Sequence, residues 1–230
     1  MTPRDLIRVG VLFICASFIC RAAPASAQTA PSKHRIEGYL GLHKAAHHGE
    51  VSTIRELVAK GTNLEARDPE GRTPLHVAAF ASQDEALRAL ATAGADLNAL
   101  DNQAYDIVTI AAVDNDLQFM DLALSLGAKP GNVTSPYEGT ALIAAAHLGH
   151  YDIVKRLIAA GAPLDHVNNL GWTALIEAVI LGNGGPDHVK TVRALVAGGA
   201  NKTLSDRNGV TPWSWPDESG HIWEEILPHP

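Results

Sequence analysis

Apolar side chains recur along most of this chain at positions i and i+3, the spacing that places them on one side of a helix. Examples are Ile54 and Leu57, Leu87 and Leu90, and Val154 and Leu157. A glycine follows each of these stretches, and a glycine suits the left-handed end of a helix. These glycines are Gly61, Gly94, Gly127, Gly161 and Gly199. The pattern predicts short amphipathic helices, each ended by a glycine.

The predicted helices repeat with a period of about 33 residues. The glycines are separated by 33, 33, 34 and 38 residues, and an apolar column keeps the same spacing: Ile54, Leu87, Met120, Val154 and Val192. Alanine pairs at 45–46, 78–79, 111–112 and 145–146 mark a preceding helix in the first four periods. A unit of this size cannot bury its own apolar face, so the units must stack on one another.

Each period after the first also carries a signal for the start of its first helix. The capping candidates, whose side-chain oxygen can accept a bond from a free backbone N–H, are Thr73, Asp106, Thr140, Thr173 and Thr211. Pro74 and Pro212 follow two of them, at a helical position that needs no N–H. The start of the first unit has neither Thr nor Pro, so we expect it to be an N-terminal cap.

The repeating unit resembles the ankyrin repeat, which has a β-turn and two antiparallel helices in about 33 residues. The motif Thr-Pro-Leu-His is complete at 73–76 and degraded elsewhere, most of all in the third copy. The resemblance covers about residues 37–227 and implies an all-α ankyrin repeat solenoid. We expect five helix–turn–helix repeats, at about 37–69, 70–102, 103–136, 137–169 and 170–207, and a truncated C-terminal cap at 208–230.

Two insertions interrupt the period. One extra residue lies near 135–137, between the third and fourth units, and five residues with the sequence NGGPD lie at 183–187, between the two helices of the fifth unit. Insertions in repeat arrays map to loops. We therefore expect both of them to form surface loops.

The first 27 residues have the pattern of a secretory signal peptide. Arg4 and Arg8 precede an apolar stretch of 12 residues from Val9 to Cys20, and 25–27 (ASA) would be the cleavage site. The stretch is short for a membrane span, and both cysteines of the chain lie in it. We expect cleavage near Ala27, a flexible leader at 28–36, no stable membrane insertion, and a location in the periplasm or outside the cell.

Composition and charge narrow the function. Hydrophobic residues make up 46% of the chain and aromatic residues only 5%, which favours closely packed helices over a β-sandwich. The formal net charge of −7 argues against nucleic-acid binding, which needs a basic surface. No catalytic or nucleotide-binding motif is found. We therefore predict a non-catalytic, monomeric protein-binding module without a cofactor.

The histidines offer one alternative function. His43 and His47 lie four residues apart on one predicted helix, which is metal-ligand spacing, and His48 follows them. A metal- or small-ligand-binding protein using His43, His47 and His48 is therefore the alternative, although we predict no metal. The resemblance implies instead that His43 and His76, at the same repeat position, bond to the backbone of a neighbouring repeat.

The resemblance also implies where a partner would bind, namely the turn tips and the inner face of the first helices. Just before or near the helix starts lie Arg72, Tyr105, Tyr137 and Trp172, which we call the turn row. The ends of the first helices add His47, Phe80 and His147. Arg, Tyr and Trp dominate binding energy at protein interfaces. We expect an unidentified protein partner at these seven residues, with packing of Tyr105 and Trp172 against adjacent turns as the competing interpretation.

A further alternative concerns the cellular setting. The protein could be exported beyond the periplasm, as an effector that binds a host protein. The repeat pattern is compatible with either setting, because ankyrin-like arrays bind unrelated partners and the fold does not name the partner.

Overall fold

The structure is a computed structural model that describes residues 29–182 and 185–214. The chain divides into two compact units, residues 1–30 and 31–230, and all helices described below belong to the second unit. The predicted signal peptide at 1–27 lies outside the described residues. So do residues 183–184 of the predicted insertion and residues 215–230 of the predicted cap.

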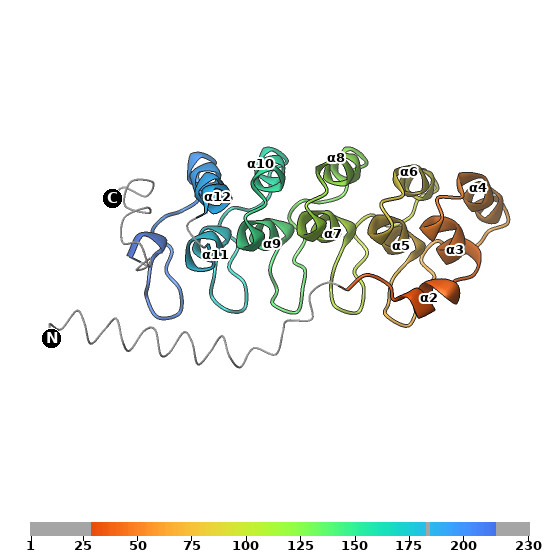
Figure 1. Cartoon of the computed structure of the whole chain (residues 1–230), viewed down its shortest axis with the longest axis horizontal. Coiled ribbons are helices and arrows are strands. Elements are labelled where there is room, and N and C mark those ends of the chain that lie inside the picture. The colour runs from red at the N-terminus through yellow and green to blue at the C-terminus, as the bar shows by residue number, and fades with distance from the viewer. Residues whose placement is uncertain (1–28, 183–184, 215–230) are drawn as a thin grey trace, which may run out of the picture. The chain divides into compact units, whose positions relative to one another are not determined.

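Within the residues that the structure describes, five pairs of helices form the array, as the repeat pattern predicts. The first helices are α3 (Gly41–His47), α5 (Pro74–Phe80), α7 (Ile107–Asp114), α9 (Ala141–Leu148) and α11 (Ala174–Ile180). The second helices are α4 (Val51–Ala59), α6 (Asp84–Thr92), α8 (Leu117–Ser125), α10 (Tyr151–Ala159) and α12 (Pro186–Ala197). Figure 1 shows the two sets as two rows, with the turns projecting beyond the row of first helices. The all-helical repeat fold is confirmed.

The core runs through the array between the two rows. The apolar column predicted on the second helices is fully buried, with 0% exposure at Ile54, Leu87, Met120, Val154 and Val192. The alanine pairs of the first helices are also buried, which lets neighbouring first helices such as α9 and α11 pack closely. Each repeat therefore completes the core of its neighbour, as expected for a stacked array.

The geometry confirms four of the five predicted caps and all five helix-ending glycines. Thr73, Thr140 and Thr173 accept from the backbone N–H three residues later, as does Asp106 in the third repeat. The five helix-ending glycines have φ between 76° and 101°. Only glycine adopts such values at little cost. Thr211 precedes a short 3₁₀ helix, η1 (Pro212–Ser214).

The segment before the first repeat differs from the expectation of a flexible leader at 28–36. Residues Lys33–Glu37 form the helix α2, whose first turn is capped by a 3.2 Å bond from Arg35 N–H to Ser32 Oγ. The Arg35 guanidinium lies 2.9 Å from Glu70 Oε1 in the first turn tip, and Ile36 packs against the core. The leader prediction is wrong from Lys33 onward, because these contacts with the array hold the segment.

The two insertions, both predicted as surface loops, differ in the structure: a turn forms around 135–137, whereas the end of 183–187 is helical. Around 135–137, an isolated bridge between Thr134 and Gly139 closes a turn in which Ser135 and Glu138 have positive φ. In the fifth repeat, helix α12 begins at Pro186 and has 12 residues, whereas each other second helix has nine. Pro186 and Asp187 therefore lengthen a helix and do not belong to a loop.

No helix in the described part of the chain is long and apolar enough to cross a membrane.

Candidate partner-binding face

An Asp or Asn side chain at an equivalent position stabilises four of the turn tips. In four turns an Asp or Asn side chain accepts from the backbone N–H groups two and four residues later, at 2.8–3.0 Å. These residues are Asp68, Asp101, Asn168 and Asp206. Such side chains replace missing backbone partners in turns. The sequence prediction overlooked this column, although the 33-residue spacing of Asp68 and Asp101 was available to reveal it.

Arg72, the first member of the turn row, points into the structure. It is 6% exposed, and its Nη1 atom lies 3.8 Å from Asp68 Oδ2. Its guanidinium also lies over the ring of Phe80, 5.3 Å from the ring centroid, in a cation–π contact. Phe80 is only partly buried, but it already has an intramolecular partner. The predicted contact residues Arg72 and Phe80 therefore pack on each other.

Tyr105 is also buried, with 8% exposure. Its backbone N–H donates to Asp101 Oδ1 at 2.9 Å, and its carbonyl oxygen lies 3.0 Å from His76 Nε2. Burial is the main cause that raises the pKa of its phenol, and the Asp101 carboxylate adds to the effect. For Tyr105 the structure favours the competing interpretation, packing between turns, because the side chain offers a partner little surface.

Tyr137 and Trp172 are different, because both are partly exposed. They lie on neighbouring turn tips, which are joined by a 2.8 Å bond from Asn169 N–H to the carbonyl of Tyr137. A second bond, from Asn169 Nδ2 to the Pro136 carbonyl, measures 3.1 Å. Tyr137 and Trp172, the two partly exposed residues of the turn row, therefore lie on adjacent turn tips in repeats four and five.

The histidines at the ends of first helices lie in different repeats. His47, in repeat one, is partly buried, and its ring meets that of His48 edge-on, with centroids 5.0 Å apart. Burial lowers the pKa of His47, and the neighbouring His48 lowers it further. The side chain of His147, in repeat four, is 51% exposed, with Nδ1 3.1 Å from Glu177 Oε2. His147 therefore belongs with Tyr137 and Trp172 in the C-terminal repeats.

The three histidines considered as a metal or ligand site, His43, His47 and His48, make separate contacts. His43 Nε2 lies 3.0 Å from the carbonyl oxygen of Arg72, and the ring stacks on Tyr39 with centroids 5.5 Å apart. His76 makes the equivalent bond to Tyr105, so the structural role expected for both histidines is confirmed. Within residues 29–182 and 185–214, no group of three or more His, Cys, Asp or Glu side chains is placed to hold a metal ion.

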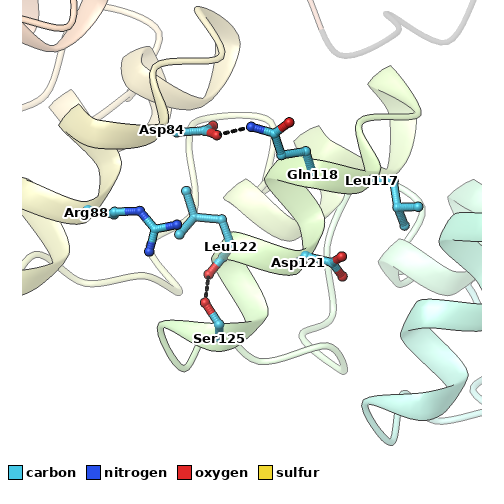
Figure 2. A pocket seen from close by; sticks show the side chains of 7 residues that line it. All are labelled: Asp84, Arg88, Leu117, Gln118, Asp121, Leu122 and Ser125. Carbon is cyan, nitrogen blue, oxygen red and sulfur yellow. Dashed lines mark hydrogen bonds between the residues drawn. The ribbon is translucent and has the colours of Figure 1, made fainter.

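A shallow groove lies on the second helices, between α6 and α8 (Figure 2). Its charged and polar lining is already paired within the protein. Gln118 Nε2 donates to Asp84 Oδ2 at 2.6 Å, and Asp121 lies 2.8 Å from Arg156. Arg88 forms an ion pair with Glu85 at 3.4 Å. The groove therefore presents no unpaired charge that would select a ligand.

Comparison with known proteins agrees with this geometry. The family model "Ankyrin repeats (3 copies)" matches residues 11–101 and 108–215. The chain is 33% identical over 184 residues to the putative ankyrin repeat protein YahD of Escherichia coli K12, covering 79% of this chain and 90% of YahD. A 68-residue segment is 37% identical to glycerophosphocholine phosphodiesterase gde1 of Schizosaccharomyces pombe, but this match spans only 6% of that enzyme.

Two solved structures are similar over most of their length. An ankyrin repeat domain from Acinetobacter baumannii AYE superimposes with a TM-score of 0.70 at 43% identity, covering 75% of this chain and 88% of that domain. The ankyrin repeat protein EF0377 superimposes with a TM-score of 0.73 at 30% identity, covering 81% and 96%. Ankyrin repeats are generally protein-interaction modules. By its repeats, its fold and these relatives, the chain belongs to the ankyrin repeat family.

Proposed function

We propose that this protein is a non-catalytic binding module that holds a protein partner on the turn tips and first helices of repeats four and five. The observation that carries the proposal is the partly exposed pair Tyr137 and Trp172, on turn tips joined by the Asn169 backbone. Aromatic side chains of this kind supply a large share of the binding energy at protein interfaces.

Repeats two and three offer less to a partner, although the sequence places Arg72 and Tyr105 in the same row. Both side chains are buried and engaged within the protein. A side chain that is already desolvated gains little from a further contact, because the burial of apolar area has already taken place. The binding face is therefore narrower than the turn row, and His147 extends it onto the first helices.

We also propose that the protein acts in the periplasm or outside the cell, after cleavage near Ala27. The support is the signal-like pattern of residues 1–27, with two arginines before a short apolar stretch and a small-residue cleavage site. Fractionation of cells that produce the full chain tests this proposal. The processed protein is expected in the periplasmic or extracellular fraction, and a full-length protein confined to the cytoplasm would contradict it.

The binding proposal is tested by crosslinking in an envelope extract of the source organism, followed by mass spectrometry. We expect Tyr137→Ala and Trp172→Ala each to reduce recovery of the same partner at least about tenfold, within the range of interface hot spots. The matched control is Tyr151→Ala, because Tyr151 is a partly buried aromatic residue at the start of α10, in the other row of helices.

All three variants should keep their helical circular dichroism and melt cooperatively, so that a loss of binding is not a loss of folding. Equal recovery of the partner by Trp172→Ala, Tyr137→Ala and the wild type would exclude this face. Loss of the partner in Tyr151→Ala alone would move the site to the second helices.

A further inference from the structure

Glu177 is a buried carboxylate at an unusual place in the array. It lies four residues after the helix cap Thr173, where the other repeats have Lys44, Val77, Ile110 and Ala144. Its exposure is 5%. Burying a carboxylate costs free energy unless hydrogen bonds or opposite charges compensate for the lost water. The side chains that contact Glu177 must therefore compensate for its burial.

Two polar side chains hold the carboxylate. Asn168 Nδ2 donates to Glu177 Oε1 at 3.0 Å, and His147 Nδ1 lies 3.1 Å from Glu177 Oε2. Among the described residues, no lysine or arginine forms an ion pair with Glu177. The negative charge is thus compensated only by a neutral amide and by a histidine from the neighbouring repeat.

For a neutral imidazole beside an ionised carboxylate, this contact favours one tautomer of His147. An ionised carboxylate only accepts hydrogen bonds, so Nδ1 of His147 must be the N–H that donates to Glu177. In the neutral ring Nε2 then carries a lone pair and is an acceptor. No described residue forms a hydrogen bond with Nε2 of His147, and the side chain is 51% exposed. At the end of α9, the Nε2 atom of His147 is therefore a hydrogen-bond acceptor, while Nδ1 of the same ring contacts the negatively charged Glu177 carboxylate.

The same hydrogen bonds also position Trp172, which is partly exposed. Asn168 Oδ1 accepts from the backbone N–H groups of Leu170 and Trp172, at 3.0 and 2.9 Å. One asparagine side chain thereby shapes the turn that carries Trp172 and holds Glu177 behind His147. Of the neighbouring helices, α12 contributes His188, whose Nε2 bonds to the backbone carbonyl of His147 at 3.1 Å and leaves the His147 ring accessible.

We propose that His147 Nε2, polarised by Glu177, accepts a hydrogen bond from a lysine or arginine side chain of the protein partner. Charge complementarity supports a cationic group, because no lysine or arginine in the described part of the chain pairs with the carboxylate and the chain has a net charge of −7. Aromatic rings such as Trp172 also attract cations. This inference rests on the proposed function, since it names the chemistry of a partner at the same face.

The test selects a phage-displayed random peptide library against the full chain and maps the selected peptides by NMR. We expect the peptides that perturb the His147 and Trp172 signals to share an arginine or lysine. Replacing an arginine by citrulline keeps the shape and removes the charge. This change should weaken binding about tenfold, which corresponds to ~1.4 kcal/mol.

The protein variant Glu177→Gln should remove this discrimination, so that the arginine and citrulline peptides bind within about twofold of each other. The amide of the glutamine is able to donate to His147 Nδ1, which makes Nε2 an N–H donor that repels a cationic donor. The matched control is Glu56→Gln, because Glu56 is an exposed carboxylate on α4, in the row of second helices and outside the proposed binding face. This control should keep the tenfold difference. Should Glu177→Gln fail to melt cooperatively, His147→Phe removes the acceptor from an exposed position and should lose the discrimination too.

The outcomes separate this inference from the proposed function. A tenfold citrulline effect that persists in both Glu177→Gln and His147→Phe would place the cation elsewhere and overturn the inference. Peptides that bind at His147 and Trp172 without a cationic residue would also overturn it, while the proposed binding face would stand. A library that yields no peptide at this face would count against the proposed function itself.

Discussion

The imidazole of His76 joins two repeats, with its Nε2 atom 3.0 Å from the carbonyl oxygen of Tyr105. Its other nitrogen, Nδ1, accepts from the backbone N–H of Thr73 at 3.2 Å. Both ring nitrogens are thus satisfied within the protein, and the residue has 0% exposure. His76 is therefore a structural link between repeats two and three.

Replacing His76 by alanine should lower the free energy of unfolding by about 2–4 kcal/mol, because buried backbone groups lose their partner and a cavity remains. Urea titration followed by circular dichroism measures the change. The control is His43→Ala, since His43 makes the same 3.0 Å bond to the next repeat but is only partly buried. A loss for His43→Ala as large as that for His76→Ala would contradict the argument from burial.

The stability of the array should fall in mild acid because of His76. Burial is the largest cause that lowers the pKa of this imidazole below its ordinary value of 6.5. Below pH 6.5 the unfolded chain then binds a proton at His76 that the folded protein does not bind, so stability decreases as the pH falls. Urea unfolding at pH 7.5 and 5.5 should show a smaller pH effect in His76→Gln than in the wild type. An unchanged pH effect would assign it to other groups.

Asp101→Ala should destabilise the protein by about 1–2 kcal/mol, because it leaves two N–H groups of the turn without their acceptor. These groups belong to Gln103 and Tyr105, each 2.9 Å from Asp101 Oδ1. Asp101→Asn keeps an oxygen at the same place and is the matched control, with an expected loss of less than about 0.5 kcal/mol. Thermal unfolding compares the two, and an equal loss in both would point to charge as the cause.

Gly127→Ala should cost about 1–2 kcal/mol, the penalty for an L-residue in the left-handed region. Gly127 has a φ of 101°, and no atom lies within 4 Å of where its Cβ would be, so the cost is purely conformational. Gly38 ends α2 with a φ of −86° and serves as the control. Chemical denaturation should find Gly38→Ala close to neutral, and a neutral Gly127→Ala would disprove the conformational argument.

Arg72→Ala should reduce stability and leave partner binding intact. The buried guanidinium lies near Asp68 and on the Phe80 ring, so its removal leaves a buried carboxylate with less compensation. We expect a loss of about 2–3 kcal/mol by urea unfolding. In the crosslinking experiment Arg72→Ala should recover the partner like the wild type below its unfolding transition. A selective loss of the partner would return Arg72 to the binding face.

The sequence by itself determined the repeat architecture, because its signals are local. A helix cap acts on the N–H three residues later, and a glycine with positive φ ends a helix whatever packs around it. Thr73, Gly127 and the column through Ile54 could therefore be placed without coordinates. The role of His43 and His76 as links between repeats was implied by the resemblance to the ankyrin repeat, and their contacts agree with it.

Only the tertiary structure decided which predicted contact residues face outward. Arg72 and Trp172 occupy equivalent positions, yet Arg72 turns inward to Asp68 and Phe80 while Trp172 stays partly exposed. The inward turn of Arg72 depends on side-chain packing within its own turn and helix, and other contacts join side chains about 30 residues apart in neighbouring repeats. Glu177 and His147 are such a pair, and Arg35 reaches Glu70 from a segment that has no repeat pattern. These contacts depend on how neighbouring units stack, which local periodicity does not specify.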